Sequence, residues 1–201
     1  MGCSFAAQSV VQVFLKARNI GGRSLIQNAA PTKQSVLQSG QNMVETIDQY
    51  LIDVTQGVFN TMLNQKVDPL PTGVDHGVPT VMELPGVNGM IGFGGKMTGT
   101  LFFSVPEPVA NRMASLILGD LCEIGPREMC DVVGEVTNML AGGCKSRLCD
   151  QGLSVVMTIP NIIRGKALRL TGRDLSFMVR RRFHAAGLDG DVDVILMGKV
   201  E

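Results

Sequence analysis

Four residues stand out because their types and spacing could do chemistry together: Asp131, Glu135, Asn138 and Pro160. They follow the pattern Asp-x3-Glu-x2-Asn-x21-Pro. In an α-helix, at about 100° per residue, Glu135 lies about 40° from Asp131 and Asn138 about 20° to the other side. A carboxylate and a carboxamide therefore project from one face of a predicted helix, roughly one turn apart.

The same segment carries an apolar stripe that would hold such a helix on a core. It lies about 130° from Asp131 in a helix and comprises Met129, Val132, Val133, Val136, Met139 and Leu140. Gly134 and Gly142 each cost about 1 kcal/mol of helix propensity relative to Ala. We interpret these glycines as removing side-chain bulk, so that a partner's backbone can approach the Asn138 carboxamide. An ordinary solvated helix face is the alternative.

The pattern resembles the signature of the CheC/CheX chemotaxis phosphatases, Asp-or-Ser-x3-Glu-x2-Asn-x21-Pro. Three flanking segments are also similar to the family: the small-residue stretch 141–146, the strand 97–103 after a tight hairpin, and the helix 110–119. The resemblance covers roughly residues 44–201. It implies a CheC-like α+β fold, with a largely antiparallel sheet and long helices packed on one face. It also implies an enzyme that hydrolyses the aspartyl phosphate of a CheY-like response regulator in two-component signalling.

The resemblance also implies a role for each residue of the motif. Asn138 would position the attacking water, and Glu135 would pair with the active-site lysine of the regulator. Asp131 would support the helix face, and Pro160 would shape a loop beside it. Magnesium is expected in the partner receiver domain, so no cofactor or metal site is expected in this chain. The CheX branch also implies a homodimer.

Two other functions remain open from the sequence. The first is a non-catalytic docking module that binds a response regulator or a flagellar-switch component. The second is a structural domain in which the polar stripe is an oligomer contact. An intact Asn138 argues against the docking module, because that role needs no residue to position water.

A partial second copy of the motif precedes the first. Asp53 and Asn60 keep the aspartate–asparagine spacing, but Gly57 replaces the glutamate and Met82 stands where the proline would be. The CheC branch resembles a duplicated version with two sites, and the CheX branch keeps one. We therefore interpret this copy as inactive and the chain as closer to CheX.

Composition excludes several classes of protein. The formal net charge is zero, which offers no electrostatic basis for binding nucleic acid. The five cysteines form no Cys-x2-Cys pair, and neither His76 nor His184 has metal-ligand spacing. An odd number of cysteines without a disulfide framework favours a reducing cytoplasm. The sequence contains no apolar stretch of the roughly 18 residues that a membrane span needs.

The sequence divides into two regions. Residues 1–42 contain four basic residues and no acidic one, so we expect a flexible extension or a start codon assigned too early, and residues 43–201 form the phosphatase-like domain. Helices are expected at 44–65, 106–118 and 125–148, and a loop through 79. Strands are expected at 80–84, in a hairpin over 89–105, and at 153–159, 166–170, 175–183 and 192–197. The triplet Arg180-Arg181-Arg182 is expected on alternate faces of a solvated edge strand.

Overall fold

The computed structural model describes residues 40–76, 82–119, 124–171 and 175–200. Most of the extension expected at 1–42, the start of the strand expected at 80–84, Cys3 and Cys122 lie outside this part of the chain. The helices are α2 (Gly40–Val58), which continues as the π-helical segment η1 (Phe59–Leu63), α3 (Glu107–Leu118) and α4 (Pro126–Asp150). The strands are β1 (Asp68–His76), β2 (Met82–Gly95), β3 (Met97–Val105), β4 (Val155–Met157), β5 (Asn161–Leu170), β6 (Phe177–Ala185) and β7 (Gly190–Val200).

Within the described residues, seven strands form one sheet in the order β1-β6-β7-β3-β2-β4, with β5 also paired to β2. Every pairing is antiparallel. The hairpin expected over 89–105 is present as β2 and β3, and it turns at Gly95, whose φ of 113° favours glycine. The prediction of an α+β fold with a largely antiparallel sheet is confirmed.

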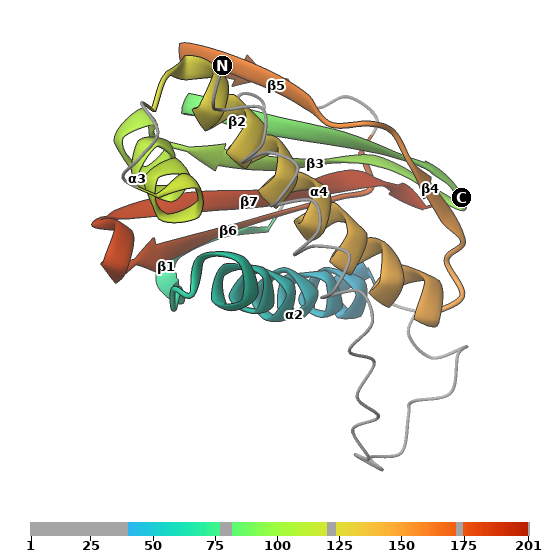
Figure 1. Cartoon of the computed structure of the whole chain (residues 1–201). Helices are drawn as coiled ribbons and strands as arrows, with labels where there is room; N and C mark the ends of the chain where they lie inside the picture. Colours follow the sequence, from blue (N-terminus) through green and yellow to red (C-terminus); the bar gives the residue numbers. More distant parts are fainter. Residues whose placement is uncertain (1–39, 77–81, 120–123, 172–174, 201) are drawn as a thin grey trace.

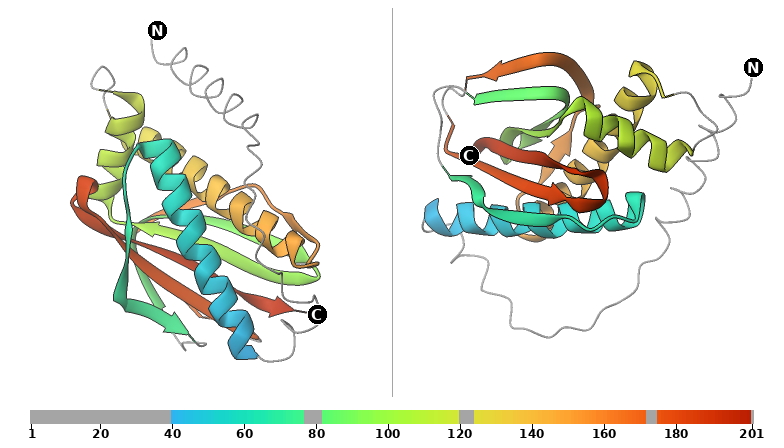
Figure 2. Two further views of the ribbon diagram at one scale, coloured as in Figure 1. Left: turned by 90° about the horizontal axis from the view of Figure 1, so that it is seen from below. Right: turned by 90° about the vertical axis from the view of Figure 1, so that its left-hand side faces the viewer.

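Helices α2, α3 and α4 cover one face of the sheet, as the views in Figures 1 and 2 show. The main core lies between them and the strands, and it includes Phe103, Val133, Val136 and Leu140. Neighbouring residues on a strand point to opposite faces, so Phe102 belongs to a second cluster on the other face of the sheet. No helix in the described part of the chain is long and apolar enough to cross a membrane.

Strand β1 corrects the expectation of a continuous loop through residue 79. It begins at Asp68 and pairs with β6, although it contains Pro69 and Pro71. Proline cannot donate a backbone hydrogen bond, and within sheets it is found mainly in edge strands and at bulges. Strand β1 is an edge strand, and its register shifts between Pro69 and Val74.

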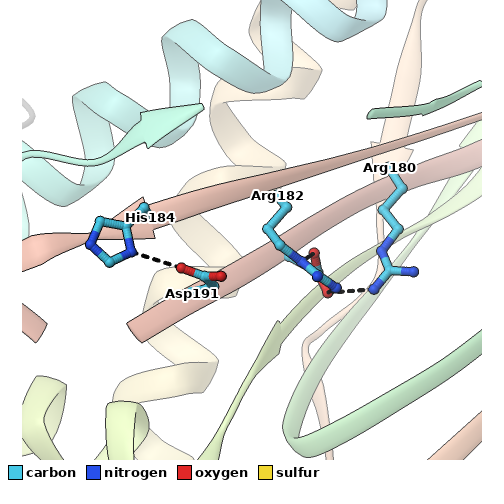
Figure 3. A network of polar contacts seen from close by, with 5 residues as sticks. Arg180, Arg182, His184 and Asp191 are labelled. Carbon is cyan, nitrogen blue, oxygen red and sulfur yellow. Dashed lines mark hydrogen bonds and ion pairs between the residues drawn. The ribbon is translucent and has the colours of Figure 1, made fainter. Parts of the chain in front are cut away.

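The expectation of a solvated edge strand for the arginine triplet is wrong, because β6 lies between β1 and β7. The side chains do alternate in direction. Arg180 Nη2 and Arg182 Nε donate to the carboxylate of Asp193 at 2.6 and 2.9 Å, as Figure 3 shows, whereas Arg181 pairs with Asp48 of α2. Burial alone would raise the pKa of Asp193, but the hydrogen bonds and charges of the two arginines outweigh it and hold the pKa below its ordinary value.

Candidate active site

Helix α4 carries three of the four motif residues, and its sequence explains where it starts and stops. Gly125 is the N-cap and Pro126 the first helical residue, where a missing N–H does no harm. The Gly125 N–H donates to Glu128 Oε2 at 3.0 Å, which satisfies a backbone donor that the helix itself leaves free. The helix ends at Asp150, with Gln151 as its C-cap, followed by Gly152 with a φ of 85°.

The structure places Asp131, Glu135 and Asn138 on the exposed side of α4, while its apolar stripe is buried against the core. Asp131 forms an ion pair with Arg127, at 3.9 Å between Nε and Oδ2, and both side chains are mostly exposed. Such a pair contributes little to stability, because water screens it. The carboxylate of Glu135 and the carboxamide of Asn138 are therefore presented to solvent, about 4.5 Å apart along the helix axis.

Strand β5 runs alongside α4 in the opposite direction. Arg164 acts electrostatically on Cys130, and one helical turn later a β-carbon at Gly134 would lie 3.5 Å from Cδ1 of Ile162. Four residues of α4 rise about 6 Å along the helix axis, and two residues of β5 span about 6.6 Å along the strand. A step of four residues in the helix therefore matches a step of two residues in the strand. The chain therefore leads from Ile162 back through Pro160 in the direction in which α4 runs from Gly134 to Asn138. Pro160 itself is exposed, in the segment between β4 and β5.

This arrangement corrects the interpretation of Gly134. The residue is buried against Ile162 rather than exposed beside Asn138, so it makes room for β5 and not for a partner's backbone. Gly142 is half-buried, with open space where its β-carbon would be. Of the two glycines, only Gly142 could therefore make room for a partner's backbone.

The position of α4 on the sheet depends on a pair of residues that sequence reasoning missed. Thr137 is buried and donates through Oγ1 to the carbonyl of Val133 at 2.6 Å. It sits directly on Gly89 of β2, where a β-carbon would lie only 1.9 Å from that Oγ1. A glycine inside a strand often marks a close approach by another element. Gly89 was therefore the signal in the sequence from which this contact could have been predicted.

Arg164 of β5 and Glu107 of α3 form an ion pair near the start of α4, at 2.6 Å between Nε and Oε1. The hydrogen bond from Arg164 holds the pKa of Glu107 below its ordinary value. Burial raises the pKa of the nearby Cys130 thiol, against the opposing effect of Arg164. A thiol with a raised pKa is a poor nucleophile. In the described residues, no three His, Cys, Asp or Glu side chains gather as a possible metal site.

The partial second copy has a different setting. Asp53 is engaged in the fold, because it accepts from Arg147 of α4 at 2.9 Å and from Gln49 at 2.7 Å. Asn60 is exposed but lies in the π-helical segment η1, whose turns are wider than those of an α-helix. Asp53 and Asn60 therefore do not repeat the angular relation of Asp131 and Asn138. The inactivity of this copy stays a prediction.

Residues 87–180 match the family model described as "Chemotaxis phosphatase CheX". All four motif residues lie inside this segment. The resemblance to the CheX family is confirmed. No curated protein sequence matches the chain.

Solved structures of CheX proteins have the same fold as this CheX-like chain. A chemotaxis protein CheX from Desulfovibrio desulfuricans matches with a TM-score of 0.68 and 21% identity, over 77% of this chain and 99% of that one. The chemotaxis protein CheX from Vibrio vulnificus matches with a TM-score of 0.65 and 21% identity, over 77% and 99%. The CheX–CheY–BeF3–Mg2+ complex from Borrelia burgdorferi matches with a TM-score of 0.55 and 21% identity, over 76% and 97%.

Proposed function

We propose that this protein is a phosphatase that hydrolyses the aspartyl phosphate of a CheY-like receiver domain. The observation that carries the proposal is the exposed pair Glu135 and Asn138 on α4, inside the segment that matches the CheX family. A structurally similar protein, CheX from Borrelia burgdorferi, was solved with CheY, BeF3 and Mg2+. That complex supports a receiver domain as the partner.

Asn138 is the proposed catalytic residue, and it acts by positioning water. Phosphoryl transfer passes through a loose transition state, so catalysis consists mainly of holding the nucleophile in line with the leaving carboxylate. A carboxamide both donates and accepts hydrogen bonds and carries no charge. It therefore orients a water molecule without adding negative charge beside the phosphoryl group. Its exposure on a packed helix lets it enter the partner's site without rearrangement of α4.

Glu135 has a different role. A free carboxylate close to a phosphoryl group would be repelled, which argues against a general base. We assign it to the receiver's active-site lysine, and this ion pair sets the register between the two proteins. Asp131 supports the exposed helix face, and Pro160 shapes the connection between β4 and β5. Magnesium belongs to the receiver, where it would neutralise the phosphoryl oxygens.

The test is to add the purified chain to phosphorylated receiver domains from the same genome and to follow loss of the acyl phosphate. Phosphate release by substoichiometric amounts of the chain is expected, because one molecule turns over many receivers. Tight binding to a phosphorylated receiver without faster phosphate loss would instead support the docking module.

Two further features belong to this proposal. The protein acts in the cytoplasm, which five cysteines without a disulfide framework favour. It forms a homodimer, as the CheX branch implies, and sedimentation at several concentrations tests this. If the α4 stripe were itself the dimer contact, Glu135 and Asn138 would be protected from solvent without any receiver present.

A further inference from the structure

Ile159 precedes Pro160 and has the largest exposed fraction, 78%, among the large apolar side chains of the described residues. A single exposed apolar residue needs no explanation by itself. Ile159 differs because of its place in the fold. It lies beside the motif proline, in the connection between β4 and β5.

The backbone around Ile159 is fixed on both sides. Before it, Thr158 exchanges two hydrogen bonds with Gly92 of β2: its N–H donates to the Gly92 carbonyl at 3.0 Å, and its Oγ1 accepts from the Gly92 N–H at 2.9 Å. After it, Asn161 pairs with Met90. Three residues, 158–160, therefore lie against the two residues of β2 between Met90 and Phe93. This is a β-bulge, a feature that often redirects a side chain beside an active site.

Ile159 also has little conformational freedom to lose on binding. It is β-branched, which limits its side-chain rotamers, and it precedes a proline, which limits its backbone. The Thr158 hydroxyl donates to the carbonyl of Ile159 at 3.1 Å. An apolar side chain fixed in this way loses less entropy when a partner covers it than one on a mobile loop.

The order of side chains across the surface indicates what covers Ile159. On α4, Asn138 lies between Glu135, about 60° away, and the edge of the helix that faces β5. A partner therefore meets a carboxylate on one side of Asn138 and a fixed apolar side chain on the other. In the proposed function this partner is the receiver domain, whose lysine meets Glu135, so the side chain that covers Ile159 belongs to the rim of the same pocket.

We propose that Ile159 is a positioning residue that docks against an apolar side chain at the rim of the receiver's phosphorylated pocket. The inference rests on the proposed function. The receiver is held at two points, the Glu135 pair and the Ile159 contact.

The test compares full-length variants on a phosphorylated receiver from the same genome. Ile159→Ser should lower kcat/KM about tenfold, a loss that places it among the minority of interface residues that contribute strongly to binding. The loss should fall on KM, with kcat within about twofold, because docking is a binding effect. Ile159→Leu should stay within about twofold of the unchanged chain, since it keeps the apolar contact.

Val156→Ser is the matched control. Val156 is 66% exposed and lies three residues earlier, on the side of the sheet where it borders Gly94. This variant should retain kcat/KM within about twofold. All variants should keep the thermal unfolding midpoint of the unchanged chain, because the substituted side chains are exposed.

The proposal is overturned if Ile159→Ser matches the unchanged chain, if Val156→Ser loses as much, or if kcat falls while KM stays constant. Binding to a receiver loaded with beryllofluoride and Mg2+ separates this inference from the phosphatase proposal. If the chain binds the beryllofluoride-loaded receiver but does not dephosphorylate a phosphorylated one, the phosphatase proposal fails. The affinity of Ile159→Ser for the loaded receiver then still decides the docking role. If the chain neither binds nor hydrolyses, both proposals fail.

Discussion

Gly89→Ala should displace α4 from the sheet and reduce both stability and activity. A β-carbon at Gly89 would lie 1.9 Å from Oγ1, 2.8 Å from Cβ and 3.0 Å from Cγ2 of Thr137. Rotating the Thr137 side chain about its Cα–Cβ bond would replace the Oγ1 contact with a contact to another substituent. The Thr137 Cβ does not move in this rotation and stays too close to the new methyl group. The helix backbone must therefore move by roughly 1 Å to restore contacts of about 3.5 Å or more.

The magnitude follows from this displacement. Inserting a methyl group into a packed core costs about 1–3 kcal/mol of unfolding free energy. Asn138 is the next residue on α4, so the shift changes its position relative to the β4–β5 connection. A misplacement of roughly 1 Å near reacting groups lowers turnover by up to about 100-fold, so we expect kcat to fall by at least about tenfold.

Urea unfolding and receiver dephosphorylation measure the two effects. Gly94→Ala is the control on the same strand, because its β-carbon would meet Val156 Cγ2 at an ordinary 3.7 Å. It should change stability by no more than about 0.5 kcal/mol. In the double variant Gly89→Ala with Thr137→Ala, the clash is relieved, so the combined loss should be smaller than the sum by at least about 0.5 kcal/mol. Additive losses, or equal effects at Gly89 and Gly94, would refute the reasoning.

Three further predictions concern single side chains. Asn138→Ala should abolish stimulated dephosphorylation yet leave binding to a beryllofluoride-loaded receiver largely intact; turnover that survives this change but is lost on adding Asn60→Ala would mean that the second copy is active. Glu135→Ala should weaken receiver binding, and the loss should shrink when the receiver's lysine is neutralised; equal losses in both backgrounds would exclude the ion pair. Asp193→Asn should lower the unfolding free energy at pH 7 by about 1.5–3 kcal/mol, the range for a hydrogen bond to a charged group, because it removes the carboxylate that accepts from Arg180 and Arg182. Because the folded-state pKa of Asp193 is lowered, its contribution is present above the unfolded value of about 3.8 and is lost as the pH falls through the folded pKa; the difference between the variant and the unchanged chain should therefore shrink below pH 4 in urea titrations.

The parts of the fold that sequence could predict are those with a strong periodic signal. The apolar stripe of α4 recurs at helical spacing, and the β2–β3 hairpin alternates around a pair of glycines. The exposed stripe with Asp131, Glu135 and Asn138 follows from the same periodicity, because the polar face of such a helix is opposite its apolar one.

Other features carry no such signal. Strand β5 was expected to begin at residue 166 but begins at Asn161; its side chains are mostly exposed, so no alternation of apolar and polar residues marks its start. The burial of Gly134 could not be read from helix angles alone, because it depends on Ile162, a residue of a later strand. The ion pairs of the arginine triplet depend on Asp48 and Asp193, which only the tertiary fold brings close.

The antiparallel course of α4 and β5 gives the interval between Asn138 and Pro160 a physical meaning. From Asn138, the helix travels about 18 Å to its end at Asp150, and the returning strand covers that distance at about 3.3 Å per residue. The 21 residues between Asn138 and Pro160 therefore combine a helical part, which rises about 1.5 Å per residue, with an extended part, which rises about 3.3 Å per residue. Lengthening the helix by one turn would keep the proline in the same place relative to the asparagine only if the strand also grew by roughly two residues. A single insertion would shift the proline along the helix and reverse the faces of the residues around it, so natural insertions should fall in the turn after Gly152 or occur as matched changes in both the helix and the strand.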